Sequence, residues 1–308
     1  MSKPKVIAIV GPTSSGKSAL GILIAKKLAV YPESYRGEVI SADSRQVYRG
    51  LDIGTGKVTK KEMAGVPHHL LGVANPKRQF SADDFVRLGE RAISNILQKT
   101  RIPIVVGGTG FYVDALLGRF NLPNVAPNQK LREQLEQRTT TQLFKQLQKL
   151  DSARAQTIEP EHKRRLIRAI EIAKAVGKSP SKSQITNPTN NKYEVLWLGI
   201  NPPKTTLKKR IHTRLLARLK AGMVREAQKL HAAGLTYKRM EELGLEYRSL
   251  ARFLQGTISR LALELELERA INHYAKRQLR WFKRNSDIVW IKNSADALRR
   301  AKKFVNAK

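Results

Sequence analysis

The chain has no cysteine, and it lacks any apolar run long enough to cross a membrane. The first absence excludes disulfides, thiolate nucleophiles and cysteine-based metal sites, and it fits a reducing compartment. The start, MSKPK, precedes an apolar run too short for a signal peptide, so we expect a cytoplasmic protein. The histidines include no HxxxH pair, and a histidine metal site is therefore not expected either.

Acidic residues are also scarce. The 308 residues include 58 lysines and arginines but only 25 aspartates and glutamates, which gives a formal net charge of +33. An enzyme with one small phosphate site needs only a few cations, whereas a polyanion contacts many of them. Nucleic acid is therefore the expected partner. An anionic membrane is the lesser alternative, because no amphipathic lipid-facing segment stands out.

One short motif predicts a phosphate site. The stretch GPTSSGKS, Gly11–Ser18, follows an apolar run at 6–10 that predicts a buried strand. It precedes the periodic apolar residues Leu20, Ile24 and Leu28, which predict a helix. This is the P-loop pattern in its usual strand–turn–helix setting, where backbone amides, a lysine and a magnesium-binding serine hydroxyl surround an anion. The motif predicts a bound polyphosphate, but it does not identify the reaction.

Apolar runs alternate with helical patterns along the chain, which predicts an α/β fold with a mainly parallel sheet flanked by helices. The expected strands lie at 6–10, 38–41, 69–73, 102–108, 193–200 and 287–291. Between residues 121 and 185 arginine- and glutamine-rich helical segments replace the strands, so a small helical insertion is expected there. The α/β core would comprise residues 1–120 and 186–308. The polar stretch 177–191, with two prolines, is expected to be a loop.

Two polar segments are expected beside the P-loop, because the carboxyl ends of parallel strands meet at one edge of a sheet. The segment SADSRQVY follows the second predicted strand, and its Asp43 is either a helix N-cap or a base or metal ligand. We favour the functional interpretation, since the residues that follow are polar and loop-like. The segment VVGGTGFY ends the fourth predicted strand, and its glycines would expose backbone around Thr109.

Two later helical segments carry basic residues at helical spacing. In the helix that follows NPPKTT, Arg214 flanks a predicted apolar stripe and can reach inward as a phosphate clamp, although most basic residues on a helix are solvated. The segment HYAKRQLRWFKRN mixes basic residues with Trp281, which suits a nucleic-acid backbone with an occasional stacked base. The alternative is a surface helix in which Trp281 belongs to the core.

Six motifs occur together in the order GPTSSGKS, SADSRQVYRGLDIGTGK, PHHLL, IPIVVGGTGFY, the R-x-x-x-R helix before AGMVREA, and YAKRQLRWFKR. In this combination the chain resembles the tRNA dimethylallyltransferases, also called tRNA isopentenyltransferases, over nearly its whole length. The resemblance implies a fold similar to P-loop kinases. It also implies transfer of a dimethylallyl group from dimethylallyl diphosphate to N6 of the adenine at tRNA position 37, with release of diphosphate. The implied partners are tRNA and the donor, the implied cofactor is Mg²⁺, and we expect a monomer.

The resemblance implies roles for individual residues. Asp43 matches the general base of the family, and Thr109 and Arg214 would lie near the acceptor and the bridging oxygen of the donor. The donor diphosphate would be bound by Gly11, Thr13, Ser14, Ser15, Gly16, Lys17 and Ser18. Ser18 would also hold the metal ion. Contacts with tRNA are implied for Asp43, Ser44, Arg45, Gln46, Thr109, Arg132, Arg164, Arg165, Leu166, Ile167, Arg168, Lys276 and Arg277.

Two functions from other classes stay open beside tRNA prenyl transfer. A small-molecule or nucleoside kinase would explain the P-loop, but it would leave the charge of +33 and the basic insertion unexplained. A non-catalytic RNA-binding module on a kinase-like fold would explain the charge, but it would leave Lys17, Ser18 and Asp43 without a purpose.

Overall fold

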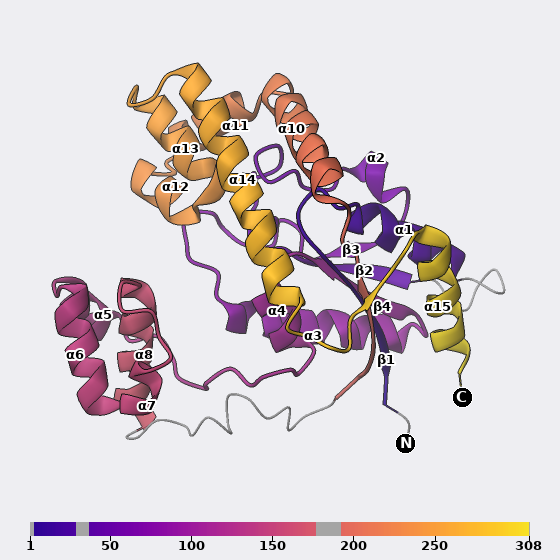
Figure 1. Cartoon of the computed structure of the whole chain (residues 1–308), viewed down its shortest axis with the longest axis horizontal. Helices are drawn as coiled ribbons and strands as arrows, with labels where there is room; N and C mark the ends of the chain where they lie inside the picture. Colours follow the sequence, from indigo (N-terminus) through magenta and orange to yellow (C-terminus); the bar gives the residue numbers. More distant parts are fainter. Residues whose placement is uncertain (1–2, 29–36, 177–191, 308) are drawn as a thin grey trace. The chain divides into compact units, whose positions relative to one another are not determined.

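The computed structural model describes residues 3–28, 37–176 and 192–307, and the chain divides into two compact units (Figure 1). The first unit comprises Met1–Leu117 and Asn191–Lys308, and the second is the intervening Gly118–Asn190. The loop expected at 177–191 lies outside the described residues. Among the described residues, no helix combines the length and the apolar composition that crossing a membrane requires.

A six-stranded parallel sheet with the strand order β3-β2-β4-β1-β5-β6 forms the centre of the first unit. Its strands are β1 (Lys5–Val10), β2 (Gly37–Ala42), β3 (His68–His69), β4 (Ile102–Gly107), β5 (Glu194–Gly199) and β6 (Val289–Trp290). The predicted fold class is therefore confirmed. The strand expected at 69–73 is wrong beyond its first residue, because the backbone of Leu70 is left-handed (φ 62°) and ends β3.

Strand β1 shows why the apolar runs form buried strands. Successive side chains of a strand point to opposite faces, so Val6, Ala8 and Val10 enter one hydrophobic core while Ile7 and Ile9 enter another. All five are fully buried. A strand that is covered on both faces reads as a continuous apolar run, as in other parallel sheets.

Helices form a layer on each face of the sheet (Figure 1). The core that contains Val6 is shared with α3 (Ala82–Gln98), α4 (Gly110–Leu116), α10 (Lys204–Lys220), α11 (Met223–Ala232), α12 (Tyr237–Leu243), α13 (Leu245–Leu254) and α14 (Arg260–Phe282). The core that contains Ile7 is shared with α1 (Lys17–Lys27) and α15 (Ser294–Asn306). The short helix α2 (Lys60–Met63) precedes β3.

The second unit is all-helical in its described part and has a core of its own. It consists of α5 (Gln129–Glu136), α6 (Thr140–Leu150), α7 (Ser152–Ala155) and α8 (Lys163–Val176). Leu143 and Leu147 of α6 pack in this core with Leu166 and Ile170 of α8. Their spacings of four residues place each pair on one face of its helix, which is why two polar-looking segments bury a shared apolar stripe.

Candidate active site

Three loops leave the sheet next to one another at its carboxyl edge, because β4 lies between β1 and β2. The P-loop (residues 11–18) follows β1, the Thr109 loop (residues 107–110) follows β4, and the Asp43 loop (residues 43–50) follows β2. All three line one hollow of about 310 Å³, to which α10 and α14 also contribute. The strand order thus brings together segments that are far apart in the sequence.

The P-loop is shaped for an anion by its backbone. Gly11 (φ 148°) and Gly16 (φ 97°) adopt conformations that favour glycine, and a Cβ at Gly11 would lie 2.5 Å from the carbonyl oxygen of Ile200. Gly16 is the N-cap of α1, and no described side chain caps this helix, so its first amides remain available to a phosphate. The N-terminus of α3, in contrast, is closed by a capping box at Ser81.

Lys17 is the first residue of α1, and its Nζ donates a 2.6 Å hydrogen bond to the carbonyl oxygen of Pro12. Burial lowers the pKa of Lys17 to about 7, while the Asp43 carboxylate opposes this shift and Arg214 adds to it. The ammonium is therefore only partly protonated near neutral pH, and a bound diphosphate would restore its charge. Ser18 lines the same hollow.

Asp43 caps a turn and not a helix, and its carboxylate also faces the hollow. Its Oδ1 accepts hydrogen bonds from the backbone N–H groups of Arg45 (2.8 Å) and Gln46 (3.3 Å), so the carboxylate caps the turn after β2. No described residue donates to Oδ2, and Asp43 lines the hollow. The carboxylate is thus held in place through one oxygen, which leaves the other for a substrate proton.

Thr109 connects the Asp43 loop to β4. It is the N-cap of α4, and its Oγ1 accepts a 3.0 Å hydrogen bond from the backbone N–H of Ser44, next to Asp43. Tyr274 of α14 lies beside Thr109, and burial followed by the Asp43 charge raises the pKa of this phenol to about 12. The phenol therefore stays protonated, and the three groups form one polar cluster at the edge of the sheet.

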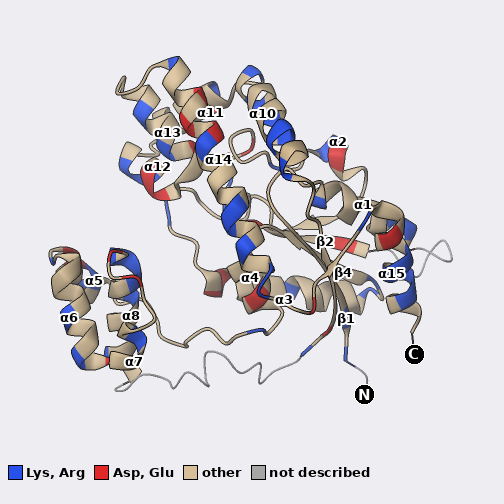
Figure 2. Cartoon of the chain, viewed as in Figure 1, with Lys and Arg blue, Asp and Glu red and all other residues tan. Residues whose placement is uncertain are grey.

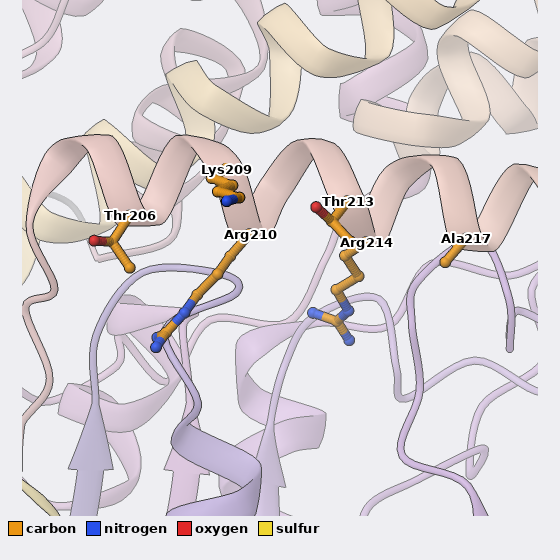
Figure 3. Close-up of a pocket in the computed structure, with 6 residues that line it drawn as sticks. All are labelled: Thr206, Lys209, Arg210, Thr213, Arg214 and Ala217. Carbon is orange, nitrogen blue, oxygen red and sulfur yellow. The ribbon is translucent and has the colours of Figure 1, made fainter.

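Arg214 reaches the site from α10, as the sequence predicts for a residue that flanks an apolar stripe. Figure 3 shows its side chain directed from the helix toward the loops, and its Nη2 donates a 2.8 Å hydrogen bond to the carbonyl oxygen of Gly56. Burial and the neighbouring Arg218 lower the pKa of the guanidinium. The Nε2 of Gln46 lies 3.5 Å from the same oxygen. The carbonyl oxygen of Gly56 thus holds Arg214 next to Gln46 of the Asp43 loop.

Other residues of α10 extend the site. A second hollow, of about 410 Å³, is lined by six residues of this helix (Figure 3), namely Thr206, Lys209, Arg210, Thr213, Arg214 and Ala217. Arg210 also lines the hollow of the P-loop. The sequence places Arg210 and Arg214 one turn apart, but it assigned a site role only to Arg214.

The loop that carries Gly56 is fixed by Glu226 of α11. The carboxylate of Glu226 accepts three backbone N–H groups, from Asp52 (3.0 Å), Ile53 (2.7 Å) and Gly54 (2.8 Å), and the hydroxyl of Tyr247 (2.7 Å). Sequence reasoning missed this anchor. The only available signal was its place in the AGMVREA motif, since no local pattern identifies partners more than 170 residues away.

Gln278 of α14 was also missed. It lines the hollow, it is 5% exposed, and it is hydrogen-bonded to backbone atoms of both the P-loop and the Thr109 loop. Sequence analysis singled out the same segment for its basic residues and Trp281. No sequence pattern marked Gln278, which lies among them, as a site residue.

Apart from Asp43 and Thr109, described above, the residues with implied tRNA contacts in the first unit lie in two places. Ser44, Arg45 and Gln46 are half-buried in the Asp43 loop, and Nη1 of Arg45 donates to the carbonyl oxygen of Ser44 (3.2 Å). Lys276 and Arg277 are exposed on α14, where the Arg277 guanidinium lies 5.7 Å from the centre of the Tyr274 ring. Figure 2 shows basic residues along this part of α14.

In the second unit the implied tRNA contacts differ in accessibility. Leu166 and Ile167 are buried in the helical core, so their side chains are not accessible to a partner. Arg132 and Arg168 both form salt bridges with the buried Glu171, whose pKa remains below its usual value because their hydrogen bonds outweigh desolvation.

Two other arginines of α8 are more exposed to solvent than Arg132 and Arg168. Arg164 and Arg165 both have exposed side chains, and Arg165 forms a 3.1 Å ion pair with the equally exposed Glu159. An exposed pair of this kind is weak, so the guanidinium remains available to another anion.

Comparison with known sequences supports the resemblance. Residues 46–285 match the family described as "IPP transferase", and residues 4–75 match that described as "Isopentenyl transferase". The chain is 37% identical to tRNA dimethylallyltransferase 1 of Geotalea uraniireducens, over 97% of this chain and 96% of the relative. It is 39% identical to tRNA dimethylallyltransferase 2 of Treponema denticola, over 92% of each chain.

Solved structures show the same relationship. The full-length tRNA isopentenylpyrophosphate transferase of Bacillus halodurans superposes with a TM-score of 0.70 at 34% identity, covering 98% of this chain and 96% of that one. A eukaryotic dimethylallyltransferase described as acting on tRNA superposes with a TM-score of 0.80 at 28% identity, covering 98% of this chain and 79% of that one.

Proposed function

This chain belongs to the family of the tRNA dimethylallyltransferases, and from that premise we propose that it transfers a dimethylallyl group from dimethylallyl diphosphate to tRNA. The acceptor is N6 of the adenine at position 37, next to the anticodon, and the products are N6-(dimethylallyl)adenosine and diphosphate. One observation carries the proposal. Asp43, a carboxylate suited to accept a proton, lines the same hollow as a P-loop suited to a departing diphosphate.

The donor is bound through its diphosphate. The uncapped amides of α1 and the Lys17 ammonium face this group, and Arg214 lines the same hollow. Breaking an allylic carbon–oxygen bond builds negative charge on the diphosphate, and cations placed in advance around it lower the barrier. The P-loop therefore stabilises a leaving group here instead of passing on a phosphoryl group.

A magnesium ion fits this donor set. Among the described residues, no cluster of three or more histidine, cysteine, aspartate or glutamate side chains is suited to hold a metal. Mg²⁺ commonly takes one or two protein ligands and completes its shell with phosphate oxygens and water, and the Ser18 hydroxyl in the hollow meets that need. When bound, the ion would add charge stabilisation on the diphosphate.

The acceptor side of the site supplies the base. The N6 lone pair attacks C1 of the donor while the bond between C1 and the bridging oxygen breaks, and the electrons of that bond leave with the diphosphate. A neutral adenine amine is a very weak acid, but it becomes strongly acidic once N6 has bonded to carbon. Asp43 then takes the proton. The Thr109 hydroxyl accepts from the N–H of Ser44 next to Asp43, and the resemblance implies that it would lie near the bridging oxygen of the donor.

The adenine must leave the stacked anticodon loop to react, which costs a few kcal/mol that other RNA contacts supply. We assign these contacts to Ser44, Arg45 and Gln46 beside Asp43, to Lys276 and Arg277 on α14, and to the exposed arginines of α8. The assignment to α8 concerns Arg164 and Arg165 most directly, because Arg132 and Arg168 serve the internal carboxylate Glu171. We propose a cytoplasmic location, which is consistent with a tRNA substrate.

The proposal is tested with unmodified tRNA and radiolabelled dimethylallyl diphosphate, with labelled ATP in a parallel reaction. We expect label from the prenyl donor to enter tRNA, and nuclease digestion to locate it at position 37. A transcript with guanine at that position is the matched control and should accept no label. Phosphorylation of any acceptor would favour a kinase instead, and no transfer from either donor would favour a non-catalytic RNA-binding module.

A further inference from the structure

One face of helix α14 contacts two of the three loops of the site directly, the P-loop and the Thr109 loop. Tyr274, Gln278 and Trp281 are spaced four and three residues apart, which places them on the same side of the helix. Tyr274 lies beside Thr109, whose hydroxyl accepts from the backbone N–H of Ser44 in the Asp43 loop. The Nε1 of Trp281 donates a 2.7 Å hydrogen bond to Asp114 of α4, the helix that Thr109 begins.

Gln278 is the central residue of this face, and it joins two loops directly. Its Oε1 accepts a 2.7 Å hydrogen bond from the backbone N–H of Thr13 in the P-loop. Its Nε2 donates a 2.9 Å hydrogen bond to the carbonyl oxygen of Gly108 in the Thr109 loop. Because the first partner is a donor and the second an acceptor, only one orientation of the amide satisfies both. A buried amide with two such partners has little freedom to move.

The glycines of the Thr109 loop make this contact possible. A Cβ at Gly108 would lie 2.0 Å from Nε2 of Gln278, and a Cβ at Gly110 would lie 2.1 Å from the Trp281 ring. Neither glycine has a positive φ, so conformational freedom does not explain their presence. They are required because α14 packs directly against the backbone of the loop.

We propose that Gln278 is a positioning residue for prenyl transfer, which holds the donor-binding P-loop in register with the loop of Thr109. The inference rests on the proposed function. The P-loop binds the donor, whose carbon is attacked, and Thr109 is bonded to the loop that carries the base Asp43. The amide of Gln278 therefore sets the distance between the donor and the base. Gln278 is not bonded to the amides of α1, since it contacts the P-loop at Thr13, before that helix begins. Its loss should therefore affect the chemical step more than donor binding.

The test compares Gln278→Met, Gly108→Ala and the double variant in single-turnover assays with saturating tRNA and donor. Methionine keeps the length of the side chain but removes both hydrogen bonds, and alanine at Gly108 displaces the amide without changing it. Each single variant should lower the rate constant of prenyl transfer by about tenfold to a hundredfold, because misplacement by a fraction of an ångström is costly. The dissociation constants of the donor and of tRNA should change little.

The double variant should lose no more than the more severe single variant, since both changes break the same contact. Gln255→Met is the control, because Gln255 donates one hydrogen bond to Ala251 within α13, away from the hollow, and its loss should leave the rate unchanged. Thermal unfolding is measured for every variant. Should Gln278→Met unfold below the assay temperature, Gly108→Ala alone carries the test, since it displaces the same amide without changing the charge of the hollow.

Three results would overturn the inference, namely an unchanged rate constant in Gln278→Met, a loss confined to donor affinity, or additive losses in the double variant. These are distinct from failure of the proposed function, which would show as a wild-type protein that transfers no prenyl group to tRNA.

Discussion

Gly56 offers the sharpest test of how Arg214 is positioned. Its backbone is left-handed (φ 59°), its carbonyl oxygen accepts the hydrogen bond from Arg214, and an added Cβ would lie 2.5 Å from Nη2 of that side chain. Gly56→Ala would force the guanidinium back by about 1 Å to reach ordinary van der Waals contact. A hydrogen bond to a charged group contributes about 1.5–3 kcal/mol, so its loss corresponds to about a tenfold to hundredfold effect.

The assay is single-turnover prenyl transfer together with donor binding, and the control is Gly256→Ala. Gly256 also has a left-handed backbone (φ 72°), but no heavy atom lies within 4 Å of the added Cβ. Both variants therefore carry the same backbone strain of about 1–2 kcal/mol, and only Gly56→Ala displaces Arg214. We expect similar losses of melting temperature and a loss of transfer rate at Gly56 alone. Equal rates in the two variants would refute the role of this contact.

The remaining predictions concern the base, the P-loop lysine and the RNA surface. Asp43→Asn should lower the transfer rate about 10²- to 10⁴-fold and should leave tRNA affinity, measured by filter binding, nearly unchanged. An unchanged transfer rate with a large loss of tRNA affinity would exclude a base role. Because the pKa of Lys17 is lowered to about 7, its ammonium is charged below pH 7 and loses its charge above it, while the donor diphosphate stays ionised from pH 7.5 to 9. Over that range calorimetry should show proton uptake when the donor binds, and donor affinity should fall about tenfold per pH unit. Lys17→Arg should make donor affinity nearly independent of pH, since arginine stays charged. A plot of the logarithm of tRNA affinity against the logarithm of salt concentration should have a negative slope of about 0.7–0.9 per phosphate contact. Arg164→Ala and Arg165→Ala should each make this slope less steep by the amount that one contact contributes, and an unchanged slope would exclude these residues from the interface.

The sequence predicted the parts of the site that are local. The P-loop is continuous from Gly11 to Ser18, and its setting between a strand and a helix is visible in the apolar pattern. The proximity of Asp43 and Thr109 to that loop followed from the rule that parallel strands place their carboxyl ends at one edge. The position of β4 between β1 and β2, which makes Thr109 the middle element, could not be read from the sequence alone.

The supporting contacts were not predictable, because they join residues that are distant in the chain. Gln278 and Thr13 are 265 positions apart, and Glu226 contacts a loop more than 170 residues before it. Each lies in a segment whose other residues gave stronger local signals. The burial of Leu166, in contrast, could be predicted, because apolar residues recur along its helix at the spacing that marks a buried face. That spacing distinguishes the positions of α8 that face the core from those that can contact RNA.

The chain connection between the two units has a mechanical consequence. Helix α4 begins at the Thr109 cap and ends at Leu116, and the second unit starts two residues later at Gly118. Seven residues of helix form a rod about 10 Å long, and most of this rod is buried. Residues 117–128, which follow this rod, form no helix or strand before α5 begins at Gln129. A force applied to the all-helical unit would therefore cross an irregular segment before it reached the short helix that Thr109 caps.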